Sequence, residues 1–88
     1  MQKDSWALKI EPVVFKALRR MPQKDREEIE RTIKVLVQDP FAGDIKKMIG
    51  EKNIWRRRVG SYRVLYAIKD EERLIVVSRV VRRTSQTY

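Results

Sequence analysis

Two alternating segments joined by a short turn limit the fold of this chain more than any other feature. The stretch covers residues 53–66 and reads Asn-Ile-Trp-Arg-Arg-Arg-Val-Gly-Ser-Tyr-Arg-Val-Leu-Tyr. Gly60 and Ser61 interrupt it at the point where a two-residue turn would join two strands. Apolar side chains then recur at every second position after the turn, which is the period of a strand with one buried face. The stretch therefore predicts a β-hairpin that packs on a core.

The hairpin carries four arginines, and alternation divides them between its faces. Arg56 and Arg58 share one face of the first strand, and Arg57 takes the other face. Pairing with the second strand can bring Arg63 beside Arg56 and Arg58. Three guanidinium groups on one face repel one another and call for an anion, unless they only form a solvated basic strand at an edge of the sheet. We expect Arg57 to run past the helices or to meet an acidic partner.

Length and composition exclude several classes of protein. With 88 residues the chain has room for one domain, expected to span residues 1–88. Cysteine and histidine are both absent, which removes disulfides, thiolate nucleophiles, and the commonest metal ligand and general base. We expect no metal and no cofactor. No apolar run approaches the roughly 20 residues of a membrane span and no signal peptide is evident, so a cytoplasmic protein without a membrane partner is expected.

The net charge of +9 lies almost wholly in the second half of the chain. Residues 45–88 contain twelve basic and four acidic residues, whereas residues 1–44 are nearly balanced. A surplus of this kind favours a polyanionic partner, such as RNA, DNA or an acidic protein. The basic residues lie mainly on segments with a strand-like pattern, which argues against a helix that binds a membrane surface.

The first half of the chain predicts a strand and two helices. Residues 6–10 alternate as a short strand, and proline at position 12 suits the first turn of a helix. A second helix is predicted from Pro22 to about Gln38, with an apolar stripe at helical spacing. It should end before Pro40, because the residue preceding a proline avoids helical geometry.

The remaining segments complete an α+β fold. Residues 39–52 contain one proline and two glycines and are expected to form a loop. Residues 73–81 are almost continuously β-branched, which predicts a central strand covered on both faces. The element order is then β-α-α-β-β-β, an N-terminal helical hairpin packed on a small, largely antiparallel sheet. The aromatic residues Trp55, Tyr62 and Tyr66 are expected in the core.

The hairpin sequence resembles the core motif of the RelE/ParE toxin superfamily. The matching segment runs from Trp55 to Tyr66, and the closing segment from Val80 to Tyr88 is similar to the end of that family, a basic residue followed by a terminal tyrosine. The resemblance covers the whole chain. It implies the toxin of a type II toxin–antitoxin system that acts as a ribosome-dependent mRNA interferase, an endoribonuclease that cuts mRNA in the A site and inhibits translation. The partners it implies are a RelB-like antitoxin in a hetero-oligomer, the mRNA and the ribosome.

The resemblance also assigns roles to individual residues. The implied catalytic residues are Arg58, Arg63, Arg82 and Tyr88, and the implied RNA contact in the strand is Arg56. The basic residues Lys46, Lys47, Lys52 and Arg83 complete the candidate RNA-binding set, with solvated surface charges as the alternative.

Cleavage by 2′-hydroxyl attack needs no metal, and guanidinium groups stabilise the charge that builds on the phosphate. Arginine does not readily accept a proton, so Tyr88 is the candidate base, stacking platform or orienting group. Two alternatives remain: a ParE-like toxin that inhibits DNA gyrase, and an inactive nucleic-acid-binding relative.

Overall fold

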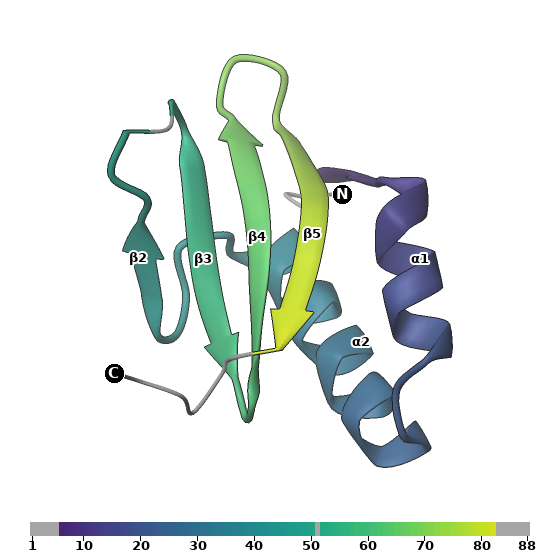
Figure 1. The fold of residues 1–88 in the computed structure, drawn as a ribbon. Coiled ribbons are helices and arrows are strands. Elements are labelled where there is room, and N and C mark those ends of the chain that lie inside the picture. The colour runs from purple at the N-terminus through teal and green to yellow at the C-terminus, as the bar shows by residue number, and fades with distance from the viewer. Residues whose placement is uncertain (1–5, 51, 83–88) are drawn as a thin grey trace.

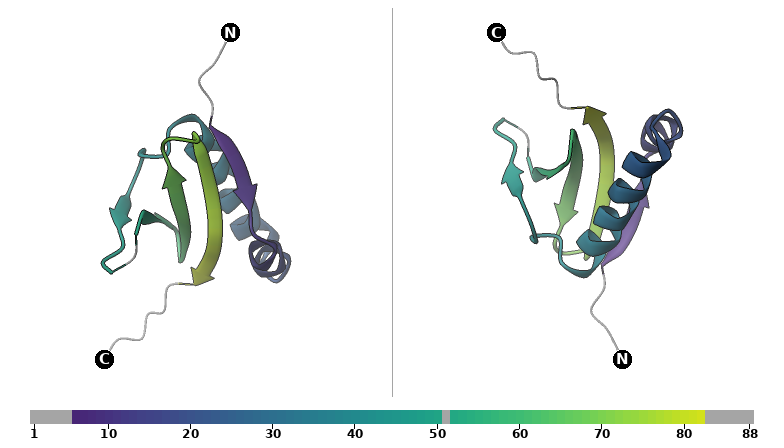
Figure 2. Two further views of the ribbon diagram at one scale, coloured as in Figure 1. Left: turned by 90° about the horizontal axis from the view of Figure 1, so that it is seen from above. Right: turned by 90° about the horizontal axis from the view of Figure 1, so that it is seen from below.

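The computed structural model describes residues 6–50 and 52–82, which form one five-stranded sheet and two helices. In chain order the elements are β1 (Ala7–Ile10), α1 (Pro12–Arg19), α2 (Gln23–Gln38), β2 (Ile45–Lys47), β3 (Ile54–Val59), β4 (Tyr62–Lys69) and β5 (Leu74–Arg82). Figure 1 shows both helices on the same side of the sheet, and they stay on that side in both views of Figure 2. The predicted α+β architecture is confirmed.

The strands are ordered β1-β5-β4-β3-β2 across the sheet. Three of the four pairings are antiparallel, and β1 runs parallel to β5. Along the sequence, α1 and α2 follow β1 at one edge of the sheet and precede β2 at the other edge. The chain therefore passes from one edge to the other before it forms the β3–β4 hairpin. Gly60 has a φ of +57° in the two-residue turn of that hairpin, and Val59 pairs with Tyr62 across it. The predicted turn is thus confirmed at the predicted residues.

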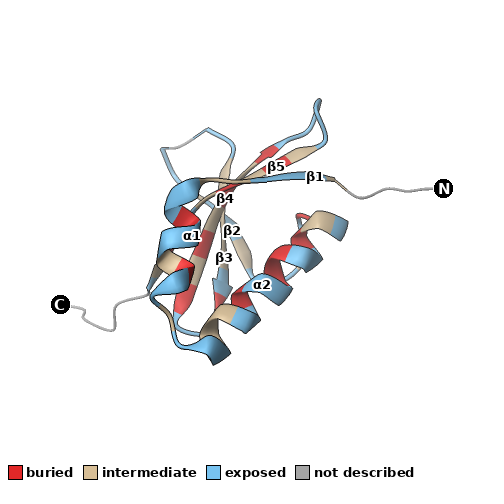
Figure 3. Ribbon diagram, turned by 90° about the vertical axis from the view of Figure 1, so that its right-hand side faces the viewer, coloured by how far each residue is buried: buried red, intermediate tan, exposed pale blue. Residues whose placement is uncertain are grey.

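Each helix buries one stripe against the sheet. Val14 and Leu18 of α1 are buried four residues apart, and in α2 the buried positions are Ile29, Thr32, Ile33 and Leu36. In Figure 3 these buried residues of α1 and α2 are the red segments. The 3–4 spacing places them on one helical face, as the apolar stripe in the sequence predicts.

Alternation along β4 separates a packed face from an open face of the sheet. Tyr62, Val64, Tyr66 and Ile68 are buried under the helices, and the residues between them are partly exposed. Tyr66 and Val64 are fully inaccessible to solvent, and Trp55 of β3 packs against the same core. The expectation that these aromatic side chains belong to the core is confirmed.

Two sequence-based expectations were wrong in detail. Residues 39–52 are not all loop, because Ile45–Lys47 pair with β3 as the edge strand β2. Strand β5 is internal, as predicted, but its buried and accessible residues alternate, so only one of its faces is covered. The register shifts where Leu65 and Tyr66 pair with Arg79 and Val77. This β-bulge leaves Ser78 without a partner in the pairing and explains why β5 shows no simple period in the sequence.

Candidate nucleic-acid interface

The open face of the sheet gathers the arginines of the hairpin. Arg58 of β3 lies directly opposite Arg63 of β4, and Arg56 lies opposite Lys46 of β2. These four residues, together with Asp44 and Ile45, line a hollow of about 170 Å³. We call it the arginine pocket. The sheet therefore brings together four of the nine residues that the sequence singled out.

The charge in the arginine pocket is strongly one-sided. Four of its six lining residues are cationic, and Asp44 is the carboxylate among them. Like charges directly opposite each other on a sheet are destabilising, by a few tenths of a kcal/mol up to ~1 kcal/mol per pair. A phosphate bound among the guanidinium groups would relieve this repulsion and accept paired hydrogen bonds from their planar forks. The geometry suits a phosphodiester.

The other candidate residues lie elsewhere or beyond the described part of the chain. Lys47 pairs with Trp55, whose ring packs on the core, and Lys52 is exposed in the turn that leads into β3. Arg82 is exposed at the end of β5 and pairs with the buried Tyr62, so its register follows the packed face and not the face of Arg63. Arg83 and Tyr88 lie outside the described residues.

Asp44 is a pocket residue that the sequence did not single out. It stands directly before β2, and its carbonyl oxygen accepts a hydrogen bond from the backbone N–H of Arg58 at 3.1 Å. That bond ties the loop before β2 to the strand that carries the arginines. The signal in the sequence was weak, because a lone aspartate in a loop that contains glycine is usually a turn residue.

Arg57 fixes the same loop from the packed face. Its Nη1 donates to the carbonyl oxygen of Ala42 at 3.2 Å, so within the described residues its hydrogen-bond partner is a loop carbonyl and not the acidic group that was expected. A Cβ added to Gly43 would meet the Arg57 guanidinium, and the φ of +86° at Gly43 strains any other residue. Within the described part of the chain, the buried Nε of Arg57 has no hydrogen-bond partner.

Tyr66 completes this attachment. Its hydroxyl donates to the carbonyl oxygen of Pro40 at 2.9 Å in a buried setting. Burial raises the pKa of Tyr66 to about 12, although the neighbouring Arg57 acts in the opposite direction. Arg57 and Tyr66 thus both hold the backbone of residues 40–43, which leads directly to Asp44 and β2.

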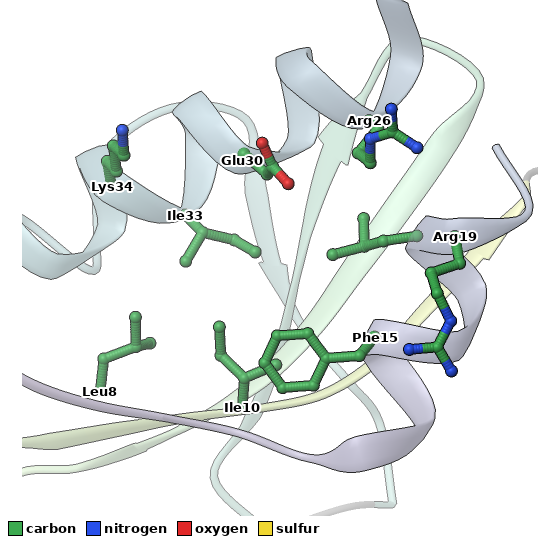
Figure 4. A pocket seen from close by; sticks show the side chains of 9 residues that line it. Leu8, Ile10, Phe15, Arg19, Arg26, Glu30, Ile33 and Lys34 are labelled. Atoms are coloured by element: carbon green, nitrogen blue, oxygen red, sulfur yellow. The ribbon is translucent and has the colours of Figure 1, made fainter. Parts of the chain in front are cut away.

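A second, apolar groove lies on the helical side of the molecule. It has a volume of about 360 Å³ and is formed between β1, α1 and α2. Figure 4 shows Leu8, Ile10 and Phe15 facing Ile33 across the groove, with charged side chains of the helices around it. Phe15 is 47% exposed here. The sheet separates this groove from the arginine pocket, so a ligand in one would not contact the other.

The described helices are all too short or too polar to cross a membrane. Within residues 6–50 and 52–82, no three acidic side chains come together as potential metal ligands.

Comparison with known families decides the classification. The family model described as the ParE toxin of type II toxin–antitoxin systems, parDE, matches residues 8–87. The chain belongs to the RelE/ParE toxin superfamily. It is a toxin of a type II toxin–antitoxin system, of the RelE/ParE type. The match extends over almost the whole chain and confirms the resemblance seen in the hairpin motif.

Individual relatives of this RelE/ParE toxin agree with the family. A curated protein of Methanocaldococcus jannaschii named "Putative toxin RelE1" is 29% identical over 73 residues, which is 80% of this chain and 81% of that protein. RelE in the archaeal RelE–RelB complex of Pyrococcus horikoshii superposes with a TM-score of 0.83 at 24% identity, covering 94% of this chain and 100% of that one. The isolated Escherichia coli RelE toxin gives a TM-score of 0.79 at 18% identity, with 93% and 88% covered. These two structures establish the fold.

Proposed function

We propose that this toxin is a RelE-type mRNA interferase, an endoribonuclease that cuts mRNA in the A site of the translating ribosome. The single observation that carries the proposal is the arginine pocket, in which Arg56, Arg58, Arg63 and Lys46 converge on the open face of the sheet. Directly opposed arginines favour an anionic ligand, and a phosphodiester accepts paired hydrogen bonds from their guanidinium groups.

The proposed reaction is a transesterification within the RNA. The 2′-oxygen attacks the neighbouring phosphorus, a bond to that oxygen forms, and the bond to the 5′-oxygen of the next nucleotide breaks. Arg63 and Arg58 stabilise the negative charge that builds on the phosphate oxygens, and Arg56 holds the RNA backbone beside them. Each such donor typically contributes on the order of 10²–10³ in rate.

The proton of the 2′-hydroxyl must leave and the 5′-oxygen must gain one. From the resemblance we assign Tyr88 to orient the nucleophile or accept its proton. Arg82, exposed at the end of β5 and off the face of Arg63, is assigned to add positive charge from outside the arginine pocket. Arg83, Lys47 and Lys52 are proposed to contact RNA outside the pocket. No metal or cofactor takes part in the proposed reaction.

We also propose an antitoxin as the physiological partner. The P. horikoshii RelE relative is in a complex with RelB, which supports a RelB-like antitoxin for this toxin and a hetero-oligomer of the two. A segment with acidic side chains laid over the open face would neutralise the arginine pocket and exclude RNA from it. Action on translating ribosomes places the protein in the cytoplasm.

Primer extension on an mRNA translated in a purified system tests the proposed activity. Cuts at codon positions are expected in the presence of ribosomes and none on the same mRNA without them. Arg63→Ala should lower the cutting rate at least 100-fold, the typical effect of losing one charge-stabilising donor. Arg31→Ala is the matched control, because Arg31 is exposed on α2, on the other side of the sheet. Folded protein that leaves translated mRNA intact would refute the proposal.

A ParE-like toxin that inhibits DNA gyrase is the second candidate. The observation that favours it is the matching family model itself, which describes a ParE toxin. It predicts inhibited supercoiling and broken DNA in a gyrase assay, with translated mRNA left intact. The two assays performed on one protein preparation therefore distinguish the two functions.

A further inference from the structure

The arginine pocket continues into a second hollow at the edge of the sheet. This edge hollow has a volume of about 370 Å³ and is lined by Lys46, Lys47, Met48, Ile49 and Arg56. It shares Lys46 and Arg56 with the arginine pocket. Through these two side chains the arginine pocket leads to the β2 edge of the sheet, where Lys47, opposite Trp55, alternates to the other face.

Ile49 is the unusual residue of the edge hollow. Its side chain is 98% exposed, whereas the other large exposed apolar residues are no more than 54% exposed. It lies in the turn after β2, where the backbone N–H of Met48 donates to the carbonyl oxygen of Ile54 at 2.8 Å. An apolar side chain held away from the core contributes nothing to folding. It is available to a ligand.

The chemistry of the edge hollow is that of a nucleotide site. Lys46, Lys47 and Arg56 supply three positive charges, and among the lining residues that the structure describes there is no carboxylate. Met48 and Ile49 add an apolar surface beside them. This pairing of cations with apolar side chains matches the two parts of a nucleotide, a charged phosphate and a base with a flat apolar face.

We propose that the edge hollow is a subsite for the nucleotide next to the cleaved phosphate, with its base against Met48 and Ile49 and its phosphate near Lys46 and Arg56. The proposal rests on the proposed function, because it takes the arginine pocket as the place of cleavage. Neighbouring strands are ~4.8 Å apart, so two strand spacings place β2 about 10 Å from Arg63 on β4. An RNA strand laid across the sheet therefore reaches the edge hollow within one or two nucleotides.

Photocrosslinking on the ribosome tests the placement. The probe is a ribosome programmed with an mRNA whose A-site codon carries 2′-deoxynucleotides, which cannot be cleaved, and 4-thiouridine beside the codon. Trypsin cuts after Lys47 and Lys52 and releases the peptide of residues 48–52. The mRNA crosslink is expected on this peptide. A crosslink of this peptide to ribosomal RNA or protein instead, or an mRNA crosslink confined to other peptides, would overturn the subsite.

Substitution of Ile49 gives an independent readout. Ile49→Ser should weaken binding of the same programmed ribosome about threefold to tenfold, as expected for losing part of a buried isoleucine surface. The matched control is Val13→Ser, because Val13 is 54% exposed on α1, on the other side of the sheet. Equal affinity of the wild type and Ile49→Ser would refute the subsite.

Cleavage by the wild type separates the two proposals. If the wild type cuts translated mRNA and the edge hollow fails both tests, the subsite is wrong and the activity stands. If the wild type cuts nothing, both fall together.

Discussion

Removing the charge of Arg63 should stabilise the fold while it abolishes cleavage. Arg63 lies directly opposite Arg58 and diagonally from Arg56 on the open face. Arg63→Met keeps the length and the apolar stem of the side chain and removes the guanidinium. Because the arginine repels its neighbours in the free toxin, its loss should raise the free energy of unfolding.

The size of the effect follows from the register. Directly opposed residues have Cβ atoms about 5 Å apart, and two unit charges ~7 Å apart in water repel by about 0.6 kcal/mol. Screening at 0.1 M salt, where the Debye length is about 10 Å, roughly halves that value. With the repulsion from the diagonal neighbour Arg56 included, we expect Arg63→Met to raise the free energy of unfolding by about 0.5–1 kcal/mol at low salt. That is equivalent to roughly 2–8 °C in melting temperature for a chain of this length.

Urea unfolding at low and high salt measures this gain. Arg63→Met should be more stable than the wild type at low salt, and the difference should vanish at about 1 M salt, where the Debye length is about 3 Å. A double-mutant cycle with Arg58→Met isolates the pair and should show an unfavourable coupling. Arg31→Met, exposed on α2 on the other side of the sheet, should change little.

The reasoning would be refuted if Arg63→Met lost stability, or if its effect did not depend on salt. Either result would mean that Arg63 is held by contacts within the fold and is not poised for an external anion.

Two further predictions concern the loop before β2. Gly43→Ala should cost about 1–3 kcal/mol in urea unfolding, since the φ of +86° strains any side chain and the added Cβ would displace the Arg57 guanidinium; a neutral result would contradict this backbone conformation. Tyr66→Phe should cost about 1–2 kcal/mol at pH 7, because the buried carbonyl of Pro40 loses its donor. The folded-state pKa of Tyr66 is raised to about 12, so the stability it contributes is complete below pH 10 and is lost as pH rises from 10 to 12. Wild type should therefore lose more stability than Tyr66→Phe over that interval, and parallel curves would refute this assignment.

The sequence predicted the hairpin and the helices well because local patterns determine them. The turn at Gly60 interrupts a clear alternation, and the helices have regular apolar stripes. Strand β2 was missed because three residues, two of them lysines, show no period. Asp44 and the attachment of Arg57 to residues 40–43 depend on contacts between segments, which no local pattern encodes.

The register of β5 shows the same limit. A bulge at Ser78 changes the face on which every later residue lies, and a β-branched run conceals it. Strict alternation from Val76 would place Arg82 on the open face, whereas the bulge places it opposite the buried Tyr62. Alternation in the sequence therefore does not determine on which face of the sheet a residue beyond a bulge lies, and the structure is needed to assign it.

The one-sided packing of the sheet has a consequence for how toxicity is lost by mutation. Along β3 and β4 the side chains of the arginine pocket alternate with those of the core. Neighbouring residues therefore determine two separable properties, the charge of the open face and the stability of the fold. Substitutions at Arg58 or Arg63 should yield folded, abundant and harmless protein, whereas substitutions at Val64 or Tyr66 should remove the protein itself. Survivors selected for resistance to the toxin should fall into these two groups, and immunoblotting would separate them.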